Sequence, residues 1–182
     1  MMTLGTARIV SAAAPAAFFA RWADMATWPE WNADTEWVRL DGPFATGSTG
    51  VLKPKGGPKT KFVISEVSGE RFTDVSMLVG ARLTFDHRIQ RTAEGGSEVQ
   101  VTVSLGGPLA LLWNQILGKG IKKTLQRDLE ALREAAEAKT GEADGLSAAR
   151  SSGESGNDGD GESSSSQGDS RRNDHTEIGV RA

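Results

Sequence analysis

The sequence predicts an α+β protein in which a curved antiparallel sheet of about seven strands is wrapped on a long C-terminal helix, with two short helices after the first strand. Two observations carry this prediction. Short runs with alternating apolar residues fill residues 35–105, and apolar residues three and four apart fill residues 108–139. Strands joined by short turns favour an antiparallel meander, whose apolar face needs the long helix as its cover.

The first elements follow from proline positions and from aromatic spacing. A short strand is expected over about residues 5–10, and a helix over residues 16–25 with Pro15 in its first turn. Proline is tolerated there because its missing N–H would have no partner inside the helix. A second, short helix begins near Pro29, and one helical turn places Trp28 and Trp31 on similar faces.

The middle of the chain reads as a series of strands separated by glycine-containing turns. Strands are expected at residues 35–40, 47–52, 61–67, 71–79, 81–91 and 98–105. The loop over residues 53–61 carries four lysines, and we interpret it as a solvated hairpin. Alternation leaves open whether Glu66 faces inward with Phe62 and Ile64 or outward.

The last element is the longest, and its apolar residues form one stripe. We expect Pro108 at its first helical position and its end near Lys139. Gly118 and Gly120 either bend this helix or create room beside it, because glycine lacks a side chain. A curved sheet wrapped around such a helix leaves a cleft between the two.

The composition divides the chain into two parts. Residues 140–182 hold 9 Ser, 8 Gly, 9 acidic and 4 basic residues, with few sizeable apolar side chains. Such a segment buries too little apolar surface to offset the entropy of ordering it, so we predict a disordered tail there. The folded domain is therefore expected over residues 1–139.

Composition also excludes several classes of function. The formal net charge of -3 favours no nucleic-acid partner, and the absence of cysteine excludes thiolate metal sites and cysteine nucleophiles. Only two histidines are present, so we expect no metal and no cofactor. Pro15 interrupts the apolar run over residues 9–20, and a Gly-Gly-Pro break divides the run over residues 99–118. We therefore expect a cytoplasmic protein without an integral membrane segment, of undetermined oligomeric state.

The order of elements and several short motifs resemble the START-like (SRPBCC) helix-grip superfamily, in particular its polyketide cyclase/dehydrase and lipid-transport group. The motifs, over about residues 7–139, are Trp22-Ala23-Asp24, Trp28-Pro29-Glu30-Trp31, Leu40-Asp41-Gly42-Pro43-Phe44, Gly47-Ser48-Thr49-Gly50, Gly106-Gly107-Pro108-Leu109 and Leu129-Glu130-Ala131-Leu132. The resemblance implies a deep pocket for an apolar or aromatic small molecule, used either to carry a lipid or to guide ring closure in a polyketide.

His87 is the principal candidate for a polar site residue. Strict alternation places it on one face with Leu83, Phe85 and Ile89, where an imidazole could bind a ligand carbonyl or transfer a proton. The alternative is a histidine satisfied by a neighbouring group. The other candidate ligand-binding residues, which equally well form core, are Trp28, Trp31, Leu83, Phe85, Val101, Val103, Trp113, Ile116, Leu117 and Ile121.

These observations favour a protein that binds a hydrophobic small molecule between the sheet and the final helix. One alternative is a cyclase or dehydrase that uses the same cavity with His87 as acid–base. Another is a partner-binding module without a small ligand. The residues themselves reveal no catalytic constellation, because His87 is the only histidine in the predicted domain.

Overall fold

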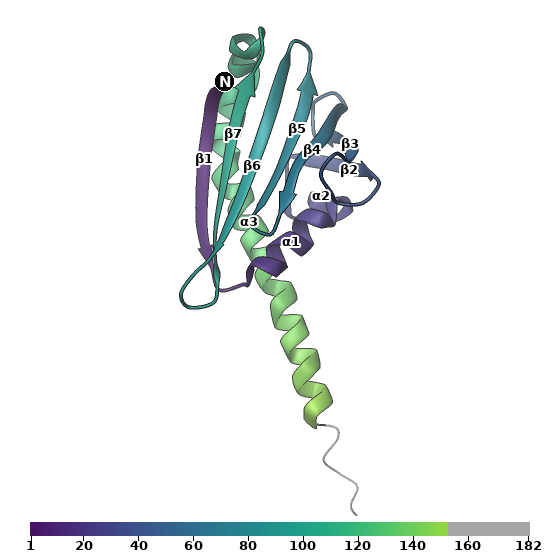
Figure 1. Ribbon diagram of the computed structural model, residues 1–182, viewed down its shortest axis with the longest axis vertical. Helices are drawn as coiled ribbons and strands as arrows, with labels where there is room; N and C mark the ends of the chain where they lie inside the picture. Colours follow the sequence, from purple (N-terminus) through teal and green to yellow (C-terminus); the bar gives the residue numbers. More distant parts are fainter. Residues whose placement is uncertain (153–182) are drawn as a thin grey trace, which may run out of the picture.

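The computed structural model describes residues 1–152, with side-chain surroundings defined as far as Ala138. The strands and α-helices are labelled in Figure 1. In chain order the elements are β1 (Met2–Ser11), α1 (Pro15–Ala23), a 3-10 helix (Met25–Thr27), α2 (Trp28–Trp31), β2 (Thr35–Asp41), β3 (Thr49–Pro54), β4 (Thr60–Ser68), β5 (Arg71–Leu78), β6 (Ala81–Arg91), β7 (Ser97–Gly106) and α3 (Ala110–Ser152).

The seven strands form one antiparallel sheet in the order β1-β7-β6-β5-β4-β3-β2. Consecutive strands from β2 to β7 are neighbours, and β1 pairs with β7, so the first and last strands of the chain lie side by side. This arrangement confirms the predicted α+β fold. It also confirms that two short helices follow the first strand, because α1 and α2 come between β1 and β2 along the chain. Both lie beside one end of the sheet (Figure 1).

The long helix α3 lies behind the sheet and continues past its edge (Figure 1). It packs mainly on β1 and also contacts α1, β6 and β7. Its close approach to β1 occurs at Gly5, where an added Cβ atom would lie 3.5 Å from the Leu125 side chain. The buried Arg21 of α1 donates from Nε and Nη2 to the Ala135 carbonyl, at 2.9 and 2.8 Å, and so links α1 to α3.

Two predicted boundaries differ from the structure. Pro108 does not begin the helix, because residues 107–109 form a turn and α3 starts at Ala110. The helix also runs to Ser152, beyond its expected end at Lys139, through the first part of the predicted tail. The remainder of that tail, 153–182, lies outside the described residues.

The core lies between the sheet and the helices. Its largest fully buried side chains are aromatic, and they come from α1 and β5: Phe18, Trp22 and Phe72. Alternate residues of β1, β6 and β7 complete it, as the period of two in a strand requires. The sheet face that turns toward α3 is called the inner face below, and the opposite face is called the outer face.

Candidate functional site

The inner face of β6 is the one that the sequence predicted. Leu83 and Ile89 are buried there, and His87 lies between them with Phe85 in the same alternating row. Strand pairing sets His87 opposite Phe72 of β5 and Val101 of β7. Of the predicted inner-face residues, Leu83, Val101 and Val103 are buried, whereas Phe85 and His87 are partly exposed.

His87 lies among aromatic rings. Its imidazole stacks on Phe72, with ring centroids 4.7 Å apart, and lies 5.4 Å from the Trp22 ring. Nδ1 is 3.2 Å from the Phe72 carbonyl oxygen. Because a carbonyl only accepts, Nδ1 carries the proton and donates it, and Nε2 keeps a free lone pair. Nε2 has no hydrogen bond to any residue that the structure describes.

The electrostatics keep this imidazole neutral. Burial among apolar rings lowers the pKa of His87 to about 4, although the Phe72 carbonyl and the charge of Asp86 act in the opposite direction. At neutral pH the ring therefore presents an acceptor at Nε2 to the inner face. A neutral imidazole can accept a hydrogen bond from a hydroxyl group or take up a proton.

Asp74 is an inner-face residue that the sequence analysis missed. It lies on β5 between Ile64 and Phe85, and is only 7% exposed. Among the described residues its carboxylate accepts a hydrogen bond only from its own backbone N–H. Burial raises the pKa of Asp74 to about 7, since an isolated carboxylate is costly in an apolar surrounding.

The signal for Asp74 was present in the alternation of β5. Phe72, Asp74 and Ser76 occupy every second position, and Phe72 is in the core. Asp74 is diagonal to His87 in the antiparallel pairing, which in standard sheets separates two residues by roughly 7–8 Å. Ser76 follows on the same face, buried and without a side-chain hydrogen bond to another described residue.

The tryptophans near this wall differ in how their indole N–H groups are satisfied. Trp28 is buried and donates from Nε1 to the Trp22 carbonyl at 3.2 Å. The buried Nε1 atoms of Trp22 and Trp31 have no partner among the described residues. A buried indole normally finds an acceptor, so Trp22, which is 1% exposed and touches His87, adds an unpaired donor to the group.

On the helix side, the predicted residues divide into two groups. Trp113, Leu117 and Ile121 are partly buried and pack against the core. Trp113 also donates from its indole Nε1 to the Val79 carbonyl at 2.9 Å, which ties the start of α3 to the β5–β6 turn. Ile116 was predicted beside them but is 59% exposed, because helical geometry turns it away from the sheet.

Glu66, whose side chain the alternation left unassigned, lies on the outer face. A β-bulge between Ile64 and Glu66 turns Glu66 outward, where it pairs with Arg71 at 3.0 Å. The lysine-rich loop joins β3 and β4; Lys53 pairs with Glu36 at 3.0 Å, and Lys59 lies over the Trp37 ring. The predicted solvated hairpin is therefore partly anchored.

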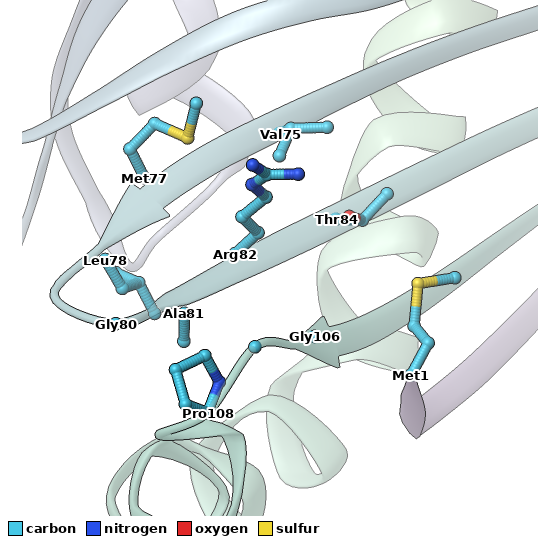
Figure 2. A pocket seen from close by; sticks show the side chains of 11 residues that line it. Met1, Val75, Met77, Leu78, Gly80, Ala81, Arg82, Thr84, Gly106 and Pro108 are labelled. Atoms are coloured by element: carbon cyan, nitrogen blue, oxygen red, sulfur yellow. The ribbon is translucent and has the colours of Figure 1, made fainter.

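Two hollows stand out in the described part of the chain, and both lie away from the predicted cleft. The larger, about 730 Å³, is open and lies over the outer face near the β5–β6 turn and the β7–α3 junction (Figure 2). The smaller, about 320 Å³, lies near the end of β1. The cleft beneath α3 remains a prediction, supported by the partial exposure of Phe85, His87 and Leu117.

Within the described residues, no cluster of three or more His, Asp or Glu side chains is arranged to hold a metal ion. None of the described helices combines the length and the apolar character needed to cross a membrane.

Comparison with solved structures shows the class of fold. A hypothetical protein of Helicobacter pylori superposes with a TM-score of 0.60 at 8% identity, over 72% of this chain and 86% of that one. The di-domain aromatase/cyclase StfQ of the steffimycin biosynthetic pathway gives 0.59 at 13%, over 77% and 52%. Norcoclaurine synthase from Thalictrum flavum, in complex with dopamine and hydroxybenzaldehyde, gives 0.58 at 12%, over 76% and 86%.

At these identities the likeness concerns the fold alone, a sheet that grips a long C-terminal helix. The family follows from the sequence itself. Residues 2–137 match the profile of the polyketide cyclase/dehydrase and lipid transport family, and the chain belongs to that family. No curated protein shows significant sequence similarity to the chain.

Proposed function

We propose that the protein binds an apolar small molecule carrying an oxygen-containing group, between the inner face of β5–β7 and the first half of α3. The observation that carries the proposal is a set of polar atoms on or beside this apolar wall that have no side-chain partner among the described residues, namely the Asp74 carboxyl oxygens, Nε2 of His87 and Nε1 of Trp22. A buried polar atom without a partner costs free energy, and a ligand oxygen or hydroxyl would relieve that cost.

The remaining contacts of such a ligand would be apolar. Phe85 lies opposite Asp74 on the neighbouring strand, and Leu117 and Ile121 of α3 pack against the same core; all three are partly exposed. Burial of apolar ligand surface contributes roughly 25 cal/mol per Å², less the cost of ordering the ligand. The polar atoms would then set the orientation of the ligand rather than supply most of its affinity.

The experiment compares matched ligands in displacement of anilinonaphthalene sulfonate from the full chain. Naphthol and acetylnaphthalene carry one oxygen on the ring system that naphthalene presents bare. We expect the oxygenated ligands to bind about tenfold more tightly than naphthalene, and this preference to fall to about twofold in Asp74→Asn and His87→Phe. Asp86→Asn, a carboxyl change on the outer face, is the control and keeps the full preference.

Two results would count against the proposal. One is that the dye and all three ligands fail to bind to the wild-type protein. The other is that the preference for oxygenated ligands is unchanged in both inner-face variants. Native mass spectrometry of the purified protein adds a direct check, because a bound apolar molecule would appear as a discrete mass increment that is lost on denaturation.

A second candidate function, a dehydratase or cyclase, is favoured by the position of Asp74 and His87 on the same inner face, diagonal to each other across β5 and β6. Burial raises the pKa of Asp74 to about 7 and lowers that of His87 to about 4, so near pH 7 about half of the Asp74 carboxyl groups hold a proton while His87 is neutral. On a β-hydroxyketone, His87 Nε2 would take a proton from the carbon beside the carbonyl. That electron pair would form the C=C bond, and the hydroxyl would leave with the Asp74 proton as water.

Turnover separates this candidate from simple binding. A naphthyl β-hydroxyketone would lose water to give a conjugated enone, which is followed by its near-ultraviolet absorbance. Catalysis predicts turnover in the wild type that falls at least a hundredfold in His87→Phe, far more than the roughly fivefold loss of affinity for oxygenated ligands expected in this variant. The absence of turnover, together with retained binding, would leave only the binding function.

A further inference from the structure

A group of exposed apolar side chains covers one end of the molecule, where the β5–β6 turn meets the start of α3. Val79 is 78% exposed and Leu111 is 73% exposed, which are high values for side chains of this kind. We call this surface the apolar tip; it consists of Val79, Leu109, Leu111, Leu112 and Ile116.

The tip is built rigidly, since two hydrogen bonds hold its parts together. The Leu109 N–H donates to the Gly80 carbonyl at 3.0 Å, and the Trp113 indole donates to the Val79 carbonyl at 2.9 Å. Gly80 and Gly107 both have positive φ, and a Cβ atom on Gly107 would lie 2.8 Å from the Gly80 carbonyl oxygen. The turn and the helix therefore present their apolar side chains as one unit.

Positive charge lies beside the tip on the same helix. Leu112, Ile116, Lys119 and Lys123 are spaced by four, three and four residues, so they form one exposed stripe of α3. At the standard helical rise, Lys119 lies about 5 Å and Lys123 about 11 Å farther along the axis than Ile116. No Asp or Glu occurs between Glu98 and Asp128, so no acidic residue of this segment offsets these charges.

The larger hollow adjoins the tip and adds a further cation. Its lining includes Gly80, Gly107 and the outer-face Arg82, and contains no acidic residue (Figure 2). Arg82 is exposed, and among the described residues its guanidinium has neither an ion pair nor a side-chain hydrogen bond. Figure 2 shows this side chain reaching over the outer face toward Val75.

We propose that the apolar tip is the surface by which the protein docks on a membrane rich in anionic lipid. Charge complementarity selects this occupant. Apolar side chains at the end of a helix would enter the interface, while lysines one to three turns behind them would meet the anionic headgroups. Arg82 would bind a lipid phosphate at the edge of the same surface. The contact is peripheral, because the described residues include no helix able to span the bilayer.

The test is co-sedimentation of the full chain with vesicles of phosphatidylcholine alone and of phosphatidylcholine mixed with phosphatidylglycerol. We expect binding to the mixed vesicles, at least tenfold weaker binding to the neutral ones, and a marked loss at about 0.5 M salt. The double variant Leu111→Asp/Ile116→Asp should lose at least tenfold in binding. Lys119→Glu should lose about fivefold or more.

Val10→Asp is the matched control, because Val10 is 64% exposed on β1 near the opposite end of the sheet. It should bind vesicles like the wild type, and circular dichroism should show all variants folded. Failure to bind the mixed vesicles, or equal binding by the Leu111→Asp/Ile116→Asp variant, would overturn the proposal. So would a wild-type dimer that this variant converts to a monomer, since a second copy would then be the occupant.

Discussion

Asp74 and Asp86 are carboxylates on neighbouring strands that face opposite sides of the same sheet. Asp86 lies on the outer face and accepts from Arg71 Nε at 2.6 Å, Arg88 Nε at 3.1 Å and Thr73 Oγ1 at 3.1 Å. Asp74 lies on the inner face with only its own backbone N–H. The two faces of one sheet therefore differ in how they treat a carboxylate. The outer one has three side-chain partners, whereas the inner one has none among the described residues.

The same difference appears in their titration. Burial raises the pKa of Asp86, but the hydrogen bonds from Arg71 and Arg88 outweigh it and hold this pKa below its ordinary value. At Asp74 only the hydrogen bond from its own backbone N–H opposes the effect of burial, and the pKa of Asp74 rises to about 7. A partnered carboxylate stabilises the folded state, whereas an unpartnered buried one is retained at a cost, which is typical of a functional group.

The largest effect is expected from Asp74→Asn. The pKa of Asp74 is raised on folding, so the folded state loses stability as pH rises from about 4 to about 7 and does not recover it above. We expect Asp74→Asn to increase the free energy of unfolding by about 2 kcal/mol at pH 8, and by much less at pH 4. Urea denaturation at pH 8 and pH 4 measures this difference. A loss of stability in Asp74→Asn at pH 8 would contradict the conclusion that the Asp74 carboxylate is buried without a side-chain partner.

His87→Phe tests the comparison further, because the pKa shifts of Asp74 and His87 change the stability of the fold in opposite directions as pH falls. The pKa of His87 is lowered to about 4 on folding, so the contribution of this residue to the free energy of unfolding is lost as pH falls from about 6.5 to 4. The wild type should therefore be nearly level over this range, whereas Asp74→Asn should lose roughly 2 kcal/mol on acidification. His87→Phe should instead gain stability as pH falls. Parallel curves for all three proteins would refute this assignment.

Asp86→Asn is expected to act in the opposite sense to Asp74→Asn at neutral pH. It breaks partly exposed ion pairs, so we expect a loss of about 1 kcal/mol at pH 7, reduced by salt. Because the pKa of Asp86 is lowered on folding, the difference from the wild type should vanish as pH falls below about 4. Thermal denaturation at low and high salt measures the effect, and a salt-independent loss would point to packing instead.

The smallest effect is expected from a deletion that spares both faces. The last buried side chain that the structure describes is Ala136, in α3. Removing residues 141–182 should therefore leave Tm within about 2 °C of the wild type and leave the pH profile unchanged. A large fall in Tm would place part of the fold beyond the domain boundary predicted at Lys139.

Much of this fold could be predicted, because its strands and helices follow from local sequence patterns. Turn glycines and alternation located β6 with its observed bounds, and Pro15 marked the start of α1. The bounds of the last helix were harder to predict, because α3 begins two residues after Pro108 and continues past its apolar stripe to Ser152. Glu66 could not be assigned to a face, because one bulged residue reverses every later side chain of a strand.

The candidate site was predicted only in part. His87 was found because it interrupts an apolar row on β6, and the structure places it on the inner face. Asp74 follows Phe72 on the inner face of β5 and is likewise polar, but only the neighbouring strands decide whether its carboxylate has a partner. Ile116 fits the stripe spacing of α3, yet the direction in which the helix lies on the sheet leaves it exposed.

The amino-acid sequence by itself determined which residues share a face, because the periods of strands and helices are local properties of the backbone. The tertiary structure alone decided which carboxylate is paired, since Arg71 and Asp86 lie on different strands and meet only through the register of β5 with β6. It also decided that Val79 lies beside the start of α3, because a hydrogen bond from the Trp113 indole to the Val79 carbonyl joins the β5–β6 turn to a helix that is distant in sequence.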